Sequence, residues 1–65
     1  MSLTVNGRVT PLPNPPTLEN LLQVVSPQHP FAVARNEEFI PVTGYALCEL
    51  NHGDRIEIVH PSAGG

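Results

Sequence analysis

The chain has 65 residues with six acidic side chains, three arginines and no lysine, so its formal net charge is −3. A chain this short forms a single domain with a thin core, which argues against a deep catalytic pocket and favours a surface or segment that other proteins recognise. The deficit of basic residues argues against nucleic-acid binding, because that affinity comes mainly from Lys and Arg on phosphates.

A tight β-hairpin is predicted at the start of the chain. Residues 2–5 alternate polar and apolar side chains, and the Asn6-Gly7 pair that follows favours the positive φ angles of a turn. A two-residue turn would set Arg8 opposite the last residue of the first strand. A bulged three-residue loop would set Leu3 opposite Val9, and we expect this version because it gives the two strands a shared apolar face.

The return strand is followed by a helix. Residues 8–12 form the strand, and Pro11 within it cannot donate to a ladder, so the strand is expected at a sheet edge. After a proline-rich connector, Thr17 is the predicted N-cap of a helix that Pro27 ends. The helix carries one apolar stripe at positions i, i+3, i+4 and i+7. These residues are Leu18, Leu21, Leu22 and Val25.

Two short strands come next. Residues 31–35 are predicted to form the third strand, and residues 38–41 a fourth that Pro41 closes, again at an edge. The stretch from 42 to 50 has mixed periodicity. It is expected to be a loop with about one helical turn, which places Leu47 and Leu50 under the sheet.

The fifth strand, residues 55–59, completes an α+β fold. Since it contains no proline, it can lie inside the sheet, paired in parallel with the first strand. This pairing requires a right-handed crossover that contains the helix. The expected strand order is therefore 2-1-5-3-4 in a mixed five-stranded sheet, with one helix packed on one face.

The chain ends in two glycines, Gly64 and Gly65, a few residues after the last predicted strand. Glycine has no Cβ, so this backbone can enter a slot too narrow for other residues. A terminal carboxylate that a partner enzyme adenylates becomes a mixed anhydride open to attack by sulfur or nitrogen. We therefore expect a folded domain over residues 1–59 and a flexible Gly-Gly tail over 60–65. Taken alone, the dipeptide would favour an ordinary frayed terminus.

Taken together, these features make the sequence resemble the sulfur-carrier proteins of thiamine biosynthesis, the ThiS type, which have a ubiquitin-like β-grasp fold. The resemblance covers essentially the whole chain. Two positions depart from the pattern: Val42, where a basic residue is common, and Pro61, where a more flexible residue is usual. The segments that carry the resemblance are Asn6-Gly7, Thr17-Leu18 with Leu21-Leu22, residues 32–36, Ile40-Pro41, residues 53–58 and Ala63-Gly64-Gly65.

The resemblance implies a carrier that catalyses nothing itself and binds no cofactor. An ATP-dependent adenylating enzyme, related to ubiquitin-activating enzymes, would recognise Ala63, Gly64 and Gly65 and form an acyl-adenylate at Gly65. Sulfur that a cysteine desulfurase mobilises would convert Gly65 to a thiocarboxylate, and thiazole synthase would take up this sulfur. Carriers for molybdopterin or amino-acid synthesis share the fold and tail, and a ubiquitin-like protein modifier or a plain interaction module are further alternatives.

The remaining candidates favour structural roles. The single cysteine, Cys48, excludes an internal disulfide and is expected to be a small buried hydrophobe. His29, His52 and His60 share no metal-ligand spacing, so no metal site is expected. An apolar patch that partners could recognise is expected around the fourth strand. Phe39, Ile40 and Tyr45 are the candidates for it, and some of these side chains are expected to belong to the core.

The sequence also indicates where the protein works. The first residues lack the charged and long apolar regions of a signal peptide, and no apolar run approaches the roughly 20 residues that span a bilayer. We therefore expect a cytoplasmic protein without membrane association that is monomeric when free.

Overall fold

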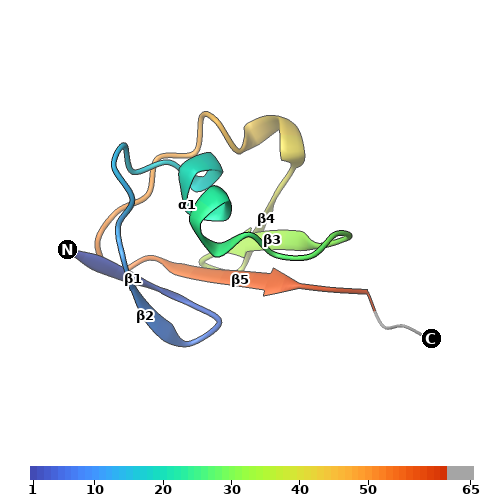
Figure 1. Ribbon diagram of the computed structural model, residues 1–65, viewed down its shortest axis with the longest axis horizontal. Helices are drawn as coiled ribbons and strands as arrows, with labels where there is room; N and C mark the ends of the chain where they lie inside the picture. Colours follow the sequence, from blue (N-terminus) through green and yellow to red (C-terminus); the bar gives the residue numbers. More distant parts are fainter. Residues whose placement is uncertain (62–65) are drawn as a thin grey trace.

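The computed structural model describes residues 1–61, which form one sheet with a helix across one of its faces (Figure 1). The order of the strands, β2-β1-β5-β3-β4, is the predicted one. β1 and β5 run parallel, and the other neighbouring pairs run antiparallel. The elements are β1 (Ser2–Val5), β2 (Arg8–Pro11), α1 (Leu18–Val25), β3 (Ala32–Arg35), β4 (Glu38–Ile40), the 3₁₀ turn η1 (Val42–Gly44) and β5 (Arg55–Val59).

The first hairpin closes with a two-residue turn, so the prediction of a bulged loop was wrong. Asn6 and Gly7 both have positive φ, at 51° and 82°, and the register sets Val5 opposite Arg8 and Leu3 opposite Thr10. Two consecutive positive φ angles define the turn whose twist matches that of the flanking strands. Val9 lies opposite Thr4 in this register, so its side chain faces away from the helix and is exposed. The edge strand β2 therefore contributes no buried side chain to the core.

Helix α1 has the predicted limits and most of the predicted stripe. Thr17 accepts a hydrogen bond from the Asn20 amide (3.2 Å) and caps the N-terminus. The three leucines of the stripe are buried, whereas Val25 at its end is 37% exposed. The helix ends because Ser26 adopts a left-handed conformation (φ 53°) and Pro27 cannot continue the ladder.

The segment between η1 and β5 packs differently from the prediction in one respect. Leu50 is buried as expected, but Leu47 is 84% exposed and Cys48 is buried beside Leu50. The reason lies in the backbone: the Leu18 amide donates to the Cys48 carbonyl (2.9 Å), and the Leu50 amide donates to the Pro16 carbonyl (2.8 Å). Residues 48–50 are therefore extended, and alternate side chains point inward.

The β3–β4 turn contains a strained glutamate, and this strain leads to a prediction. Glu37 has φ 73°, a conformation that costs a non-glycine residue about 1 kcal/mol or more. Its contact with Arg55 is 3.9 Å long between two exposed groups and contributes little. We expect Glu37→Gly to raise the thermal midpoint by about 4 °C or more. In contrast, Glu38→Gly in the adjoining strand should lower it, and a thermal scan followed by circular dichroism checks both.

Candidate functional site

The predicted site residues Ala63, Gly64 and Gly65 lie outside the described residues, so the structure describes only the strand that leads toward them. That strand is β5, whose last residue, Val59, is the predicted end of the domain. β5 pairs with β3 over four residues on one side and with β1 over two residues on the other. The proposed boundary between domain and tail stays a prediction.

The side chain of Asn6 extends the pairing of β5 beyond the end of β1. The Ile58 amide donates to Asn6 Oδ1 (2.8 Å), and Asn6 Nδ2 donates to the Ile58 carbonyl (3.2 Å). These two bonds give Ile58 the partners that another residue of β1 would supply. Asn6 therefore has two roles, since it also adopts the positive φ of the hairpin turn.

A second turn asparagine, Asn36, holds the beginning of the same strand. Asn36 donates its amide to the Arg55 carbonyl (2.8 Å), and its Oδ1 accepts from the Arg55 amide (2.9 Å). Asn36 also has positive φ (50°). The two hairpin turns thus each direct one asparagine side chain at the central strand, Asn36 at its first residue and Asn6 near its end, and only Asn6 lies close to the start of the proposed tail.

Asp54, immediately before β5, is the buried charged residue of the described part and is only 8% exposed. Its carboxylate accepts hydrogen bonds from Arg35 Nε (3.1 Å), Asn36 Nδ2 (3.2 Å) and the Asn51 amide (2.9 Å). Burial by itself would raise the pKa of Asp54. The bonds from Asn51 and Asn36 and the charge of Arg35 outweigh that effect and hold the pKa below its ordinary value. The charged side chain of Asp54 therefore links the loop before β5 to the β3–β4 turn through hydrogen bonds.

The sheet face opposite α1 carries a small apolar surface, which we call the open-face patch and define as Ala32, Phe39 and Val59. Ala32 pairs with Val59, and Phe39 pairs with Ala34, so these side chains share the face that the helix does not cover. Phe39 is 67% exposed and Val59 is 46% exposed. The patch therefore reaches the last residue of β5, where the chain leaves the sheet.

The structure divides Phe39, Ile40 and Tyr45 between the surface and the core, in agreement with the expectation that some of them are core. Ile40 pairs with Val33, which is fully buried under the helix, and both Ile40 and Tyr45 pack partly buried against the core. Only Phe39 lies on the open face, because side chains of neighbouring strand residues point to opposite faces.

Cys48, His52 and His29 make contacts within the folded domain. Cys48 is buried as predicted, and its Sγ atom lies 3.7 Å from Arg35 Nη1. The His52 Nδ1 atom accepts from the Ser2 amide (3.0 Å), and the His29 ring lies against Phe31. Over residues 1–61, no three His, Cys, Asp or Glu side chains gather in a way that could hold a metal ion. No helix in this part of the chain is both long and apolar enough to cross a membrane.

A mixed five-stranded sheet in this order, with a parallel β1–β5 pair and one helix across it, is a β-grasp of the ubiquitin-like kind. The model of the ThiS family matches residues 3–65, and the chain belongs to this family. Among solved structures, a thiamine biosynthesis protein (ThiS) from Geobacter metallireducens aligns with a TM-score of 0.82 at 23% identity, over 100% of both chains. At this identity the likeness shows the fold. No curated protein matches the chain.

Proposed function

We propose that the chain is a sulfur carrier in thiamine biosynthesis and that Gly65 is the residue that carries the sulfur. The observation that carries the proposal is membership of the ThiS family, with a match that includes Gly64 and Gly65. The absence of lysine from the chain agrees with this role, because a lysine amine would compete for an activated acyl group. On this proposal the carrier is a co-substrate of other enzymes and not itself an enzyme.

The proposed chemistry takes place in the partners. The Gly65 carboxylate attacks the α-phosphorus of ATP in the adenylating enzyme, which gives the acyl-adenylate and pyrophosphate. A hydrosulfide then attacks the acyl carbon and AMP leaves, so the product is a thiocarboxylate with no change of oxidation state. Thiazole synthase accepts this sulfur. ATP is consumed by the partner, and the carrier itself holds no cofactor.

The arrangement of β5 supports this proposal physically. The six residues from 60 to 65 span at most about 20 Å when extended, which is enough to reach into a buried site while the domain stays outside. Asn6 and Asn36 fix the strand from which this segment starts. For an activating enzyme that binds the domain, the start of this segment would therefore lie at a fixed position.

The direct test is reconstitution with the adenylating enzyme, ATP and sulfide, followed by intact-mass measurement. The proposal predicts the mass gain of exchanging one oxygen for one sulfur, and only when ATP is present. An unchanged mass in the complete mixture, with an activating enzyme shown to charge another carrier, would refute it. Transfer of the sulfur to thiazole synthase, and not to a molybdopterin or amino-acid pathway, is checked by thiamine auxotrophy on deletion.

We further expect the open-face patch to contact the activating enzyme, because it adjoins the base of the tail. Phe39→Glu should raise the KM of the carrier in adenylation about tenfold or more and leave kcat nearly unchanged, since it places a charge where an apolar anchor docks. Val24→Glu is the matched control, because Val24 is similarly exposed but lies on α1. Pyrophosphate release measures both, and equal KM values for the two variants would contradict the assignment.

A further inference from the structure

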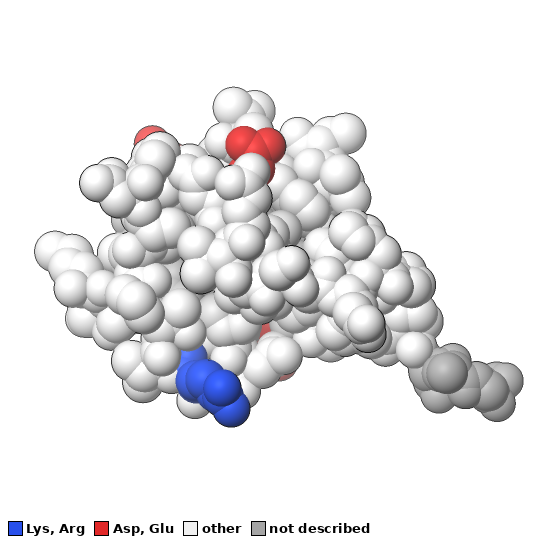
Figure 2. All heavy atoms as spheres, viewed as in Figure 1, with Lys and Arg blue, Asp and Glu red and all other residues white. Residues whose placement is uncertain are grey.

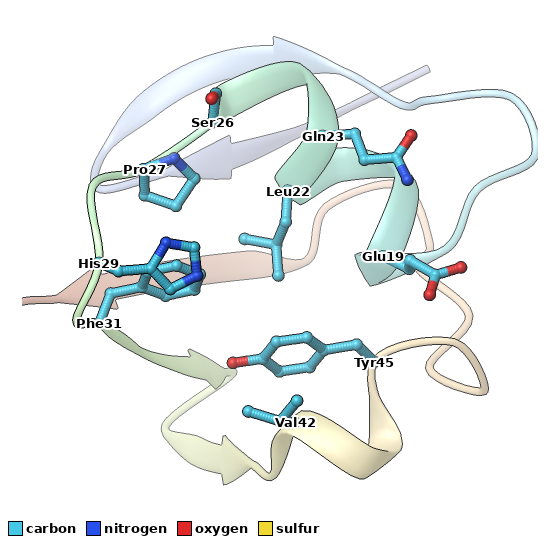
Figure 3. A pocket seen from close by; sticks show the side chains of 9 residues that line it. All are labelled: Glu19, Leu22, Gln23, Ser26, Pro27, His29, Phe31, Val42 and Tyr45. Atoms are coloured by element: carbon cyan, nitrogen blue, oxygen red, sulfur yellow. The ribbon is translucent and has the colours of Figure 1, made fainter.

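A hollow of about 350 Å³ opens on the other side of the sheet, between α1 and the segment that follows β4. Figure 3 shows Leu22 pointing into it, with the rings of Phe31 and Tyr45 on two of its sides and Val42 below. Its volume lies within the range of pockets that enclose a small ligand or a side chain. The open-face patch lies on the opposite face, so the two surfaces are separate.

The walls of the hollow are aromatic and are held in place by the core. Phe31 and Tyr45 pack partly buried against the core residues, and the His29 ring lies beside Phe31 with centroids 4.9 Å apart. The faces of aromatic rings attract cations. The backbone also fixes one edge of the hollow, because the Glu19 amide donates to the Tyr45 carbonyl (3.2 Å). The site is therefore formed before anything binds.

With histidine counted as neutral, the one charged side chain among the described residues that line the hollow is acidic. Glu19 stands at the rim, at the end away from His29, and is exposed (Figure 3). Within residues 1–61, no arginine lines the hollow, and the chain has no lysine. In Figure 2 the basic atoms lie near the β1–β2 hairpin with a few acidic atoms beside them, and the larger group of acidic atoms lies on the helical side. The hollow thus combines mainly apolar and aromatic walls with a single carboxylate, and Gln23, Ser26 and His29 add uncharged polar groups to its lining.

We propose that this hollow binds an arginine side chain that a partner protein presents. The apolar stem of the arginine lies against Leu22 and Val42, and its planar guanidinium stacks on the ring of Tyr45. The carboxylate of Glu19 accepts hydrogen bonds from the guanidinium at the rim. Lysine fits less well, because its compact and strongly hydrated ammonium group does not stack. A partner bound here leaves the open-face patch free.

The test uses the full-length ¹⁵N-labelled protein and two peptides, acetyl-Gly-Arg-Gly-amide and the same peptide with neutral citrulline in place of arginine. The arginine peptide should give saturable amide shifts at Leu22, Phe31 and Tyr45 and bind about fivefold more tightly than the citrulline peptide. Glu19→Gln should weaken binding of the arginine peptide and reduce its advantage over the citrulline peptide, because only the attraction of the aromatic faces for the cation then remains. Glu57→Gln, which removes an exposed carboxylate on the open face, should leave it unchanged.

Four results would overturn the proposal. Equal binding of the two peptides would mean that the hollow accepts an apolar anchor without regard to charge. Shifts that centre on Phe39 would place binding on the open face, and the absence of any saturable shift would remove the site. Shifts at Leu22 and Tyr45 that depend on protein concentration alone would identify a second copy of the chain as the occupant.

Discussion

Asp54→Ala is expected to destabilise the domain by about 2–3 kcal/mol. The substitution leaves the Arg35 guanidinium, the Asn36 side chain and the Asn51 amide without their shared acceptor. Because the Arg35 side chain is 28% exposed, water partly replaces the carboxylate, and we expect less than the roughly 3–5 kcal/mol lost when a fully buried ion pair is broken. Since a domain of this length is stable by only about 3–10 kcal/mol, the loss is a large fraction of the total.

Urea unfolding followed by far-ultraviolet circular dichroism measures this effect. Glu57→Ala is the matched control, because Glu57 is an exposed carboxylate on the same central strand. It should change the free energy of unfolding by less than about 0.5 kcal/mol. If the two variants unfold at the same urea concentration, Asp54 does not hold the last loop to the β3–β4 turn in the way its contacts indicate.

The same carboxylate predicts how stability depends on pH. The pKa of Asp54 in the folded protein is below its ordinary value of 3.8, so the unfolded chain binds this proton more readily than the folded chain. The stabilisation is therefore complete above the ordinary pKa and is lost as the pH falls through the lower, folded-state value. Urea midpoints recorded from neutral pH down to acid should fall more steeply for the wild type than for Asp54→Asn. Parallel curves would contradict the prediction.

Removal of Gly65 is expected to abolish sulfur loading and leave the fold intact. The acyl-adenylate must form at the terminal carboxylate, and the truncated chain presents that group one residue short of the catalytic position. A misplacement of a few ångströms is enough to remove most of the rate. Reconstitution with sulfide and intact-mass measurement reports the loading, and circular dichroism reports the fold.

Ser62→Ala is the control for this truncation, because it alters the tail and keeps both its length and its two glycines. It should load sulfur at the rate of the wild type. Undiminished loading of the chain that lacks Gly65 would mean that sulfur is attached elsewhere, and the account of the tail would then be wrong.

Much of the fold follows from local chemistry that the sequence displays. Prolines within or directly after β2 and β4 indicated the two edge strands, because proline cannot donate to a central ladder, and the parallel pairing of the first and fifth strands completed the order of the sheet. The capping threonine and the terminating proline set the limits of α1. These are short-range effects, so residue type and spacing determine them.

The errors arose where contacts between distant segments decide the outcome. The apolar pattern favoured a bulged first hairpin, but the side chain of Asn6 bonds to Ile58, 52 positions away, in the tight-turn geometry. Leu47 was expected in the core, but pairing of the adjoining backbone with residues 16–18 turned Cys48 inward instead. Nothing in the local sequence indicates either partner.

The candidate site was only partly accessible from sequence. The two terminal glycines are visible at once, whereas the roles of Asn36 and Asp54 depend on three segments meeting at the start of β5. The one feature of the sequence that could have drawn attention to Asp54 is its position as an acidic residue directly before an apolar strand. Its burial and its partners emerge only when the β3–β4 turn is placed beside it.

The most direct test of the account is the intact mass of the chain isolated from its own cells under conditions that preserve thioacids. We predict two populations, one with an ordinary carboxylate and one heavier by the exchange of oxygen for sulfur, and fragmentation should place the difference on Gly65. A single population without sulfur, in cells that are actively making thiamine, would contradict the claim that this terminus carries sulfur.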